Sequence, residues 1–398
     1  MSLEALVEIS RYYGKNPDYV LAGGGNTSWK DGETLYVKAS GTALAEASAD
    51  SFVKMDRSSL AEIWKKQYHE PSATDPFGSQ REYDVLLDMM LARRSGEEQK
   101  RPSVEALLHD LLPFSFVVHL HPALVNGLTC SVKGEETMPE IFGEKAIWIH
   151  PTNPGYVLAR AVKTAMDAYS AKHSRPPAII FLENHGVFVG SNSTGGIKEM
   201  YDEIMRGIGA RIKRNPDFSD EKRVTGAVCG ISQNPAPQAS EASERGLTRL
   251  GKKEFDIMKT LAELAGASGF IHAKDFAALV KDRASFAPVS SAFTPDHIVY
   301  AGSTPLFVEA DADLQDAWKN HKDKTGRNPK IVAVGGLCIF AAAATEKAVS
   351  LALDLFKNAV EVAVYAESFG GYKFMAQDKI DFIDNWEAEN YRSNISTK

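Results

Sequence analysis

The sequence predicts an α/β layered domain followed by a second α/β domain. In the N-terminal half, segments with apolar residues three and four apart alternate with short runs rich in Val, Ile and Phe. The first pattern is typical of amphipathic helices and the second of buried strands. The same alternation resumes after an interruption rich in Gly, Pro and Ser. A length of 398 residues also suggests two or three domains.

The expected elements of the first half follow from these patterns. Helices are expected where apolar residues recur at helical spacing, over 2–13, 58–68, 80–94, 103–112, 156–172 and 194–213. Strands are expected at the short β-branched and aromatic runs 34–39, 114–121, 146–150 and 178–189. Helices and strands in alternation indicate a layered α/β domain, although periodicity does not fix the order of the strands.

The boundary between the halves is expected where periodicity is lost. Between Val224 and Arg245, glycines, prolines, serines and an asparagine interrupt any regular pattern. We therefore expect a catalytic domain over 1–223, a linker over 224–246 and a second α/β domain over 247–398. Its helices are expected near 252–266, 274–282, 310–320 and 345–367.

An internal repeat is suggested by two stretches that align without a gap. The stretch Pro177–Phe188 aligns with Pro329–Phe340, and each leads through small residues into a predicted helix. Any buried strand that precedes a helix would give a similar pattern. The alternative is a duplicated fold whose second, degenerate copy has Leu337 where the first has His185, so that the polar chemistry lies in the first copy only.

Composition excludes several classes of protein. The chain has 45 Lys and Arg against 52 Asp and Glu, a net charge of -7, so it lacks the basic footprint of a nucleic-acid binder. No apolar run approaches the about 20 residues that span a bilayer, and the N-terminus lacks the features of a signal peptide. The three cysteines, Cys130, Cys229 and Cys338, are too sparse for a disulfide framework. We expect a cytoplasmic protein with buried thiols that acts on a small molecule.

Three histidines are candidates for a metal site. His119 and His121 close the apolar run Phe114–Val118, and residues two apart on a strand point to the same face. A pair of histidines at a strand end can also occur without any ligand. A third, His185, follows another apolar strand and precedes Gly186, which leaves room for close approach. Three imidazoles with an open fourth position are typical of catalytic zinc.

Glu105 is the candidate acid or base. It follows Ser103, which we expect to be the N-cap of a helix with Glu105 in the first turn. An acidic residue there often does no more than compensate the helix dipole. However, the short connection to the strand that carries His119 can place Glu105 beside the metal, as a ligand, as a base or as both in turn. The free N–H groups of the helix would suit a phosphate.

Two loops with glycine and hydroxyl residues are candidates for anion binding. Ala22–Lys30 reads AGGGNTSWK and matches neither the Walker A motif nor the GxGxxG fingerprint. The second loop, in Val37–Thr42, adds a lysine, hydroxyls and a glycine. Backbone N–H groups and hydroxyls from two loops can hold an anion. Two tight hairpin turns would give the same composition.

The motifs occur together in an order that resembles a known superfamily. GGGNTSWK, VKASGTAL, RPSVEALLH, HLHP and ENHGVF follow one another as in the class II aldolase/adducin superfamily, over roughly residues 5–215. The resemblance implies an α/β/α layered domain with a mainly antiparallel central sheet. The C-terminal stretches Thr294–Ile298, Thr304–Val308 and Glu367–Tyr372 resemble the aldolase half of bifunctional rhamnulose-1-phosphate aldolase/lactaldehyde dehydrogenases. No GxxxGxG or YxxxK motif is found, so we expect the dehydrogenase half to be absent.

The resemblance also implies roles for individual residues. His119, His121 and His185 would hold Zn²⁺, with Co²⁺ or Mn²⁺ as alternatives, and Glu105 would be a base or an exchangeable ligand. A substrate phosphate would be held by Asn26, Thr27, Ser40, Gly41 and Ser103. The family often has two adjacent hydroxyl residues before the glutamate, whereas here Val104 follows Ser103. This departure leaves a non-phosphorylated acid substrate open. Relatives assemble as homo-oligomers, in which a tyrosine such as Tyr372 or Tyr391 would protonate the aldehyde oxygen.

The expected function is that of a zinc-dependent class II aldolase. It would cleave a ketose 1-phosphate of the rhamnulose or fuculose type to dihydroxyacetone phosphate and a short aldehyde. One alternative is a pentose-phosphate 4-epimerase, and another is a lyase that acts on a non-phosphorylated sugar acid. A non-enzymatic, adducin-like module is a further alternative, but such a module would have lost the metal ligands.

Overall fold

The computed structural model describes residues 2–73, 75–226 and 251–388. The chain forms two compact units. The first comprises the residues up to Arg214 together with the segment that begins at Tyr365, and the second is Asn215–Val364. This division differs from the expected 1–223 and 247–398, because the chain returns to the first unit after the second. Within the described ranges, every helix is too short or too polar to cross a membrane.

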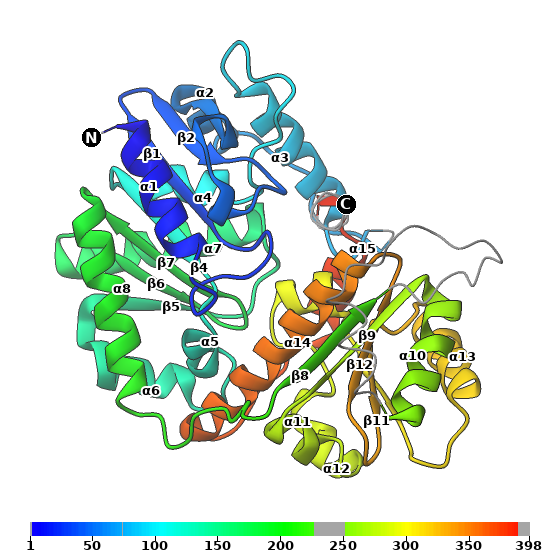
Figure 1. The fold of residues 1–398 in the computed structure, drawn as a ribbon. Coiled ribbons are helices and arrows are strands. Elements are labelled where there is room, and N and C mark those ends of the chain that lie inside the picture. Colours follow the sequence, from blue (N-terminus) through cyan, green and yellow to red (C-terminus); the bar gives the residue numbers. More distant parts are fainter. Residues whose placement is uncertain (1, 74, 227–250, 389–398) are drawn as a thin grey trace. The chain divides into compact units, whose positions relative to one another are not determined.

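The first unit is built on a seven-stranded sheet in the order β3-β2-β1-β4-β7-β6-β5 (Figure 1). Its strands are β1 (Asn26–Asp31), β2 (Thr34–Lys38), β3 (Phe52–Asp56), β4 (Phe116–Leu120), β5 (Ala146–Ile149), β6 (Ile179–Leu182) and β7 (Gly186–Ser191). Only the pair of β5 and β6 is parallel. The expected mainly antiparallel central sheet is therefore confirmed.

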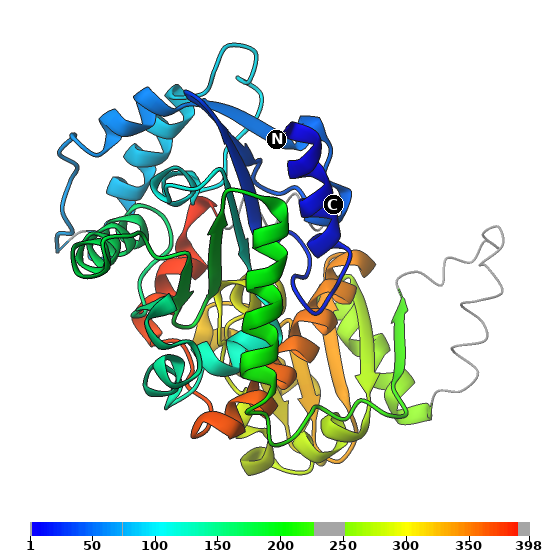
Figure 2. The same cartoon turned by 90° about the vertical axis from the view of Figure 1, so that its left-hand side faces the viewer.

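Helices cover both faces of this sheet. One face packs against α1 (Leu3–Gly14), α5 (Ala123–Thr129), α6 (Gly134–Phe142) and α8 (Thr194–Gly209), the green helix at the front of Figure 2. The other packs against α2 (Arg57–Ile63), α3 (Ser79–Leu91), α4 (Ala106–Leu111) and α7 (Tyr156–His173). Along β4, Val118 belongs to the first core and Val117 to the second, as the alternation of a strand requires. The α/β/α layering is confirmed.

The helices form where the apolar spacing predicts them. In α8, Ser193 accepts a hydrogen bond from the N–H of Gly196 and caps the helix. Its buried side chains, Ile197, Tyr201, Ile204 and Ile208, recur every three or four residues. The Tyr201 hydroxyl lies 3.1 Å from the carbonyl oxygen of Val118 and 3.3 Å from that of Val187, so it ties the helix to β4 and β7.

The structure differs from the sequence predictions at several elements of the first unit. The predicted strand 178–189 is two antiparallel strands, β6 and β7, separated by the turn 183–185. The expected glycine-rich loop at Ala22–Lys30 continues into β1, which begins at Asn26. Residues of β3, α5 and α6 were not predicted as elements. Short 3-10 turns lie at Leu44–Glu46, Ala49–Ser51, Gly143–Lys145 and Glu367–Phe369, and α15 spans Gln377–Asn385.

The second unit has a five-stranded sheet in the order β10-β11-β12-β9-β8. Its strands are β8 (Lys222–Gly226), β9 (Ala267–His272), β10 (Leu306–Val308), β11 (Ile331–Val334) and β12 (Ile339–Ala343). The helices are α10 (Lys252–Ala265), α11 (Lys274–Leu279), α12 (Arg283–Phe286), α13 (Leu314–Thr325) and α14 (Glu346–Ala366), with a 3-10 turn at Ala287–Val289 and a π-helical turn at His297–Ala301. The expected linker overlaps β8 at its start, and the rest of it, with Cys229, lies outside the described residues. Cys130 and Cys338 are buried free thiols.

The second sheet repeats the topology of the first. The order β1-β4-β7-β6-β5 recurs as β8-β9-β12-β11-β10, and each pair of neighbours has the same relative direction. Phe188 pairs with His119 in the first sheet, and Phe340 pairs with Phe270 in the second. The gapless alignment of Pro177 with Pro329 thus also places Leu337 at the position of His185. This agreement of register and topology supports the proposal of a duplicated fold.

The turn before β7 and that before β12 share an unusual backbone conformation, which allows a test. Asn184 and Gly336 occupy equivalent positions, with φ of +55° and +69°. A Cβ on Gly336 would meet nothing within 4 Å, so only the backbone should oppose a side chain. We expect Gly336→Ala to lower the free energy of unfolding by about 1–2 kcal/mol, because a left-handed residue with a Cβ is disfavoured by that amount.

Urea unfolding of the full chain measures this loss. Gly336→Asn should lose less, since asparagine tolerates the left-handed region. Gly226→Ala is the matched control, because its Cβ also meets nothing within 4 Å and its φ is not positive. Equal effects of Gly336→Ala and Gly226→Ala would contradict the prediction.

Candidate metal centre

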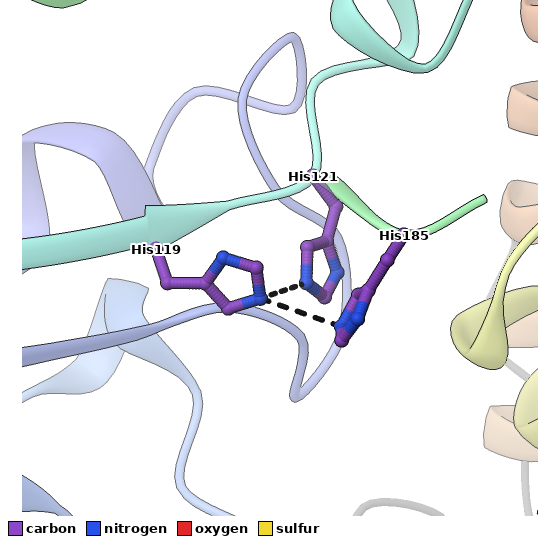
Figure 3. Close-up of side chains that lie close together, drawn as sticks. All are labelled: His119, His121 and His185. Carbon is purple, nitrogen blue, oxygen red and sulfur yellow. Dashed lines mark hydrogen bonds between the residues drawn. The ribbon is translucent and has the colours of Figure 1, made fainter. Parts of the chain in front are cut away.

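Two strand ends and one turn bring the three histidines together. His119 lies on β4, His121 follows that strand, and His185 lies in the turn between β6 and β7 (Figure 3). Because β4 and β6 are both antiparallel to β7, they run in the same direction and their carboxyl ends meet at one edge of the sheet. A Cβ on Gly186 would lie 2.5 Å from the carbonyl oxygen of Leu120, so the turn requires glycine there.

The imidazole nitrogens converge as metal ligands would. Nε2 of His119 lies 2.9 Å from Nε2 of His121 and 3.4 Å from Nε2 of His185. All three side chains are buried. Tetrahedral zinc with Zn–N bonds of about 2.0–2.1 Å separates its nitrogens by about 3.4 Å. The three histidines thus form a potential metal site, as their spacing in the sequence predicted.

The surroundings of His119 fix its ring for ligation. Nδ1 of His119 lies 3.0 Å from the carbonyl oxygen of Val187, to which it donates when it carries the proton. In that tautomer the lone pair of Nε2 faces the other two histidines. The ring of Phe188 stacks on the imidazole at 4.0 Å and 10°. Backbone and aromatic contacts therefore orient this ring toward the other two histidines.

Glu105 completes the cluster. Its Oε2 lies 3.6 Å from Nε2 of His119, and its Oε1 lies 3.7 Å from Nε2 of His185. Oε1 is buried and has no hydrogen-bond partner among the described residues. A buried carboxylate oxygen without a donor is costly. Because Oε1 of Glu105 lies beside three imidazole nitrogens, its position fits a bound cation.

The start of α4 differs slightly from the prediction. The helix begins at Ala106, and Glu105 is its N-cap rather than a residue of the first turn. Ser103 does cap the segment, since its Oγ accepts a hydrogen bond from the N–H of Glu105 at 3.2 Å. The carboxylate therefore stands one residue before the helix, where it faces the histidines.

Lys30 holds the short connection between α4 and β4. Its Nζ donates to the carbonyl oxygens of Leu112 at 2.7 Å and Phe114 at 2.9 Å. Burial lowers the pKa of this amine to about 7, although Asp110 opposes the shift. The connection thus keeps Glu105 close to the strand that carries His119.

The five predicted phosphate contacts are not all in one place. Asn26 and Ser103 lie beside Glu105, and Nδ2 of Asn26 donates to Oε2 of Glu105 at 2.7 Å. The N–H of Ser40 bonds to the carbonyl of Arg101, and Gly41 follows with a φ of +83°. Thr27 is fully buried, and its hydroxyl hydrogen-bonds Ser10 of α1 at 2.7 Å. The Thr27 hydroxyl therefore lies on the opposite face of β1 from Asn26.

Several residues around the site were missed by the sequence analysis. His109 hydrogen-bonds both Ser28 and Asn26. His109 lies four residues after Glu105, and this helical spacing was the one available signal. Glu183 and Lys373 form an ion pair across 190 positions of sequence, for which no local pattern exists. A second group, Glu135, His150 and Glu183, also approaches metal-binding spacing, but two of its members are exposed.

The turn that carries His185 is held by the segment after α14. Asn184 donates from Nδ2 to the carbonyl oxygen of Lys373 at 2.9 Å and from its N–H to Thr129. Glu183 is buried between the Lys373 ammonium and the indole N–H of Trp148. The N–H of Lys373 in turn bonds to the carbonyl oxygen of Cys130 at 2.7 Å. These contacts fix the two residues immediately before the third histidine.

Comparison with known proteins identifies the first unit. The model of the class II aldolase and adducin N-terminal domain family matches residues 4–204, just over half of the 398 residues. The chain belongs to this family. The expectation from GGGNTSWK, RPSVEALLH, HLHP and ENHGVF is therefore confirmed at the level of the superfamily, while the finer resemblance to bifunctional rhamnulose-1-phosphate aldolases is not.

Individual relatives extend the comparison. This chain is 20% identical over 440 residues to YuxG, an uncharacterised oxidoreductase of Bacillus subtilis strain 168, with 99% of this chain and 58% of YuxG covered. The chain thus spans little more than half of that relative. A class II aldolase domain from Thermoplasma acidophilum is 24% identical over 53% of this chain and 93% of its own, with a TM-score of 0.43. An L-fuculose 1-phosphate aldolase is 15% identical over 52% and 83%, with a TM-score of 0.35.

The buried Lys30 predicts a pH dependence of stability. Its folded pKa of about 7 lies below the usual lysine value of 10.5, so between these pH values the unfolded chain binds a proton that the folded chain lacks. The free energy of unfolding should therefore rise with pH over this window, by up to about 1.4 kcal/mol per pH unit from this group. Lys30→Met should remove that part of the slope. Chemical denaturation of both proteins between pH 7 and 10 measures it, and parallel profiles would contradict the prediction.

The contacts of the His185 turn predict an effect on metal affinity. Asn184→Gly keeps the left-handed backbone but loses the hydrogen bond to Lys373, whereas Asn184→Ala loses both. Lys373→Met removes the ammonium that pairs with the buried Glu183 and leaves the carboxylate beside Trp148 and the exposed His150. We expect each of these three substitutions to lower the affinity for Zn²⁺ by about 10–100-fold. Asn184→Ala should lower it further than Asn184→Gly.

Competition with a chromophoric chelator measures this affinity. The matched control is Lys379→Met, because Lys379 pairs with its exposed neighbour Asp378 at 3.0 Å and, within the described residues, its ammonium has no hydrogen bond or ion pair with the His185 turn. Unchanged affinity in Asn184→Ala would show that the segment after α14 does not position the third histidine.

Proposed function

We propose that this class II aldolase family member is a metal-dependent aldehyde-lyase that cleaves a ketose 1-phosphate to dihydroxyacetone phosphate and a short aldehyde. The observation that carries the proposal is the buried cluster of three imidazole nitrogens with the unpartnered Oε1 of Glu105. Zn²⁺ is the proposed ion, since three neutral imidazoles are its usual catalytic ligands, with Co²⁺ or Mn²⁺ as alternatives. The finer resemblance to rhamnulose-1-phosphate aldolases is part of this proposal.

The chemistry of the reaction sets what the site must supply. Cleavage breaks the bond between the α and β carbons of the ketose, and the bonding pair passes to the carbonyl side as an enediolate. The hydroxyl proton on the aldehyde side leaves, and the α carbon receives a proton. A divalent ion held by His119, His121 and His185 would supply the positive charge that stabilises the enediolate oxygens.

The chain's own residues divide the remaining tasks. Glu105 returns the proton to the α carbon on cleavage and removes it in the synthetic direction. The hydroxyl proton on the aldehyde side needs a separate acceptor, for which Tyr372 is a candidate with 36% of its surface exposed. Tyr391, the other candidate, lies outside the described residues. Lys38 does not act as a Schiff-base lysine here, because its buried Nζ donates to the carbonyl oxygens of Gly23 and Thr42.

A second candidate function is favoured by the polar groups near Glu105. Both ends of the Asn26 amide and the Thr27 hydroxyl already have partners within the protein, and Val104 stands where relatives often have a hydroxyl. Fewer groups are then free to hold a phosphate. A lyase for a non-phosphorylated sugar acid, with the same metal and base, is therefore the alternative.

Metal removal and a substrate panel test the proposed function. We expect a chelator to abolish the cleavage of ketose 1-phosphates and Zn²⁺ or Co²⁺ to restore it. His185→Ala should lower kcat/KM by at least a thousandfold, about 4 kcal/mol, because it removes one ligand of the ion. Full activity of the metal-free protein, or of His185→Ala, would contradict the proposal.

Product analysis separates the alternatives. Appearance of dihydroxyacetone phosphate indicates the aldolase, whereas interconversion of two pentose phosphates indicates the 4-epimerase. Turnover confined to sugar acids would favour the second candidate. An adducin-like binding module would neither turn over any of these substrates nor retain stoichiometric metal by mass spectrometry.

A further inference from the structure

The two oxygens of the Glu105 carboxylate have different surroundings. Oε2 accepts a hydrogen bond from Nδ2 of Asn26 at 2.7 Å. Oε1 is equally buried but has no hydrogen-bond partner among the described residues, and it lies 3.7 Å from Nε2 of His185. One oxygen is thus fixed by the protein, and the other is left for whatever binds beside the histidines.

The amide that fixes Oε2 belongs to a buried chain of hydrogen bonds. Asn26 and Ser28 lie on the same face of β1, and His109 lies one helical turn after Glu105 on α4. Nε2 of His109 hydrogen-bonds Oδ1 of Asn26, and Nδ1 lies 2.7 Å from Oγ of Ser28. Nδ2 of Asn26 also lies 3.2 Å from Oγ of Ser103.

The direction of every bond in this chain follows from the carboxylate. An ionised carboxylate only accepts hydrogen bonds, so the NH₂ group of Asn26 must face Glu105 and its oxygen must face His109. His109 must then donate from Nε2. Its neutral ring accepts at Nδ1, so the Ser28 hydroxyl donates. Burial lowers the pKa of His109, which is consistent with a neutral ring.

We propose that His109 is a positioning residue that, anchored by Ser28 and acting through Asn26, pins Oε2 of Glu105 and reserves Oε1 for the metal and the substrate proton. If the His109 ring were absent, the Asn26 amide would lose the partner that sets its orientation. A flipped amide would present its oxygen to the carboxylate, and the repulsion would displace Glu105. The role rests on the proposed function, in which Oε1 carries the proton to and from the α carbon.

This role also reassigns Asn26. The resemblance implies a phosphate contact, but its amide nitrogen is shared by Ser103 and Glu105 and its oxygen is bonded to His109. Asn26 therefore orients the base rather than the substrate. The specificity for phosphate then depends on Ser40, Gly41 and Ser103.

The tautomer of His109 is the first test, and it needs no variant. In ¹⁵N-labelled full-length protein, long-range ¹H–¹⁵N spectra should show His109 protonated at Nε2 and bare at Nδ1 throughout pH 6–9. The resonance is assigned by its loss in His109→Gln. Protonation at Nδ1, or at both nitrogens, would overturn the proposal, because Asn26 would then not be oriented as described.

The second test measures the metal site through bound Co²⁺. His109→Gln places an amide N–H near the position of Nε2–H, so it should keep the Co²⁺ affinity within about threefold and the visible spectrum unchanged. His109→Leu cannot donate and should lower the affinity by about 10–100-fold with an altered spectrum, as the loss of an outer-shell partner does. Wild-type affinity and spectrum in His109→Leu would overturn the proposal.

A control separates this effect from general loss of stability. Ser268→Ala removes a buried hydroxyl that donates to the carbonyl oxygen of Met258 at 2.7 Å in the second unit, and it should leave the Co²⁺ spectrum unchanged. Should His109→Leu fail to fold, Ser28→Ala serves instead, because it removes the hydroxyl that holds Nδ1 of His109. It should keep the Nε2–H tautomer, which Asn26 sets, but lower the Co²⁺ affinity, and wild-type affinity in Ser28→Ala would overturn the anchoring role.

These readouts remain distinct from the proposed function. If no ketose 1-phosphate is cleaved while the tautomer and the Co²⁺ results hold, the substrate is wrong and the positioning role stands. If cleavage occurs while His109→Leu has the Co²⁺ spectrum of the wild type and the same pH profile of activity, the proposed aldolase function stands and the positioning role fails.

Discussion

The antiparallel pairing of β4 with β7 is the constraint on which the site depends. It sets His119 opposite Phe188, and it fixes the turn with His185 next to the end of β4, across 66 positions of sequence. Since β4 and β6 run the same way, His121 and His185 both emerge at the same edge of the sheet. A slip of this pairing by one residue would turn His119 to the other face. Tyr201 resists such a slip, because its hydroxyl bonds the carbonyl oxygens of both strands.

The cost of burying polar groups favours a cation at the cluster. His119, His121, His185 and Glu105 are each at most 8% exposed, and a buried carboxylate is unfavourable unless it is paired. Oε2 of Glu105 has a hydrogen-bond donor, whereas Oε1 has none within the part of the chain that the structure describes. Nε2 of His119 also lies within hydrogen-bond distance of Nε2 of both His121 and His185, where two lone pairs repel unless a proton or a metal ion lies between them. An ion resolves both problems at once.

Whether the sequence predicts a contact depends on how far apart its residues lie along the chain. His119 and His121 share a face because a strand alternates, and Glu105 is near them because the connection to β4 is short. Both are local relations. Periodicity does not predict the split of 178–189 into two strands, because the polar turn 183–185 is only three residues long and the apolar run resumes directly after Gly186. The hydrogen bonds that link Glu105 to Ser28 and the ion pair of Lys373 with Glu183 join segments that are distant in the sequence. Local periodicity therefore does not predict them.

The second sheet shows that the strand topology and the residues of the site are specified separately. Its strands keep the order and directions of β1, β4, β7, β6 and β5, yet Phe270 and Leu337 stand where His119 and His185 would be. Strand pairing requires buried side chains at alternate positions. Phenylalanine and leucine meet this requirement as well as a metal-binding histidine does.

His272 occupies the place of His121, because it follows Ile271 as His121 follows Leu120 in the paired strands. Its Nδ1 is buried without a hydrogen-bond partner among the described residues. Among the described residues, His272 belongs to no group of three or more side chains at metal-binding spacing. The equivalent left-handed turn of the second sheet also lacks the contact that Asn184 makes. In the first unit Asn184 reaches Lys373 and so positions His185, whereas Gly336 has no side chain with which to do so. A copy that keeps the backbone but not these contacts can retain its fold without retaining the site.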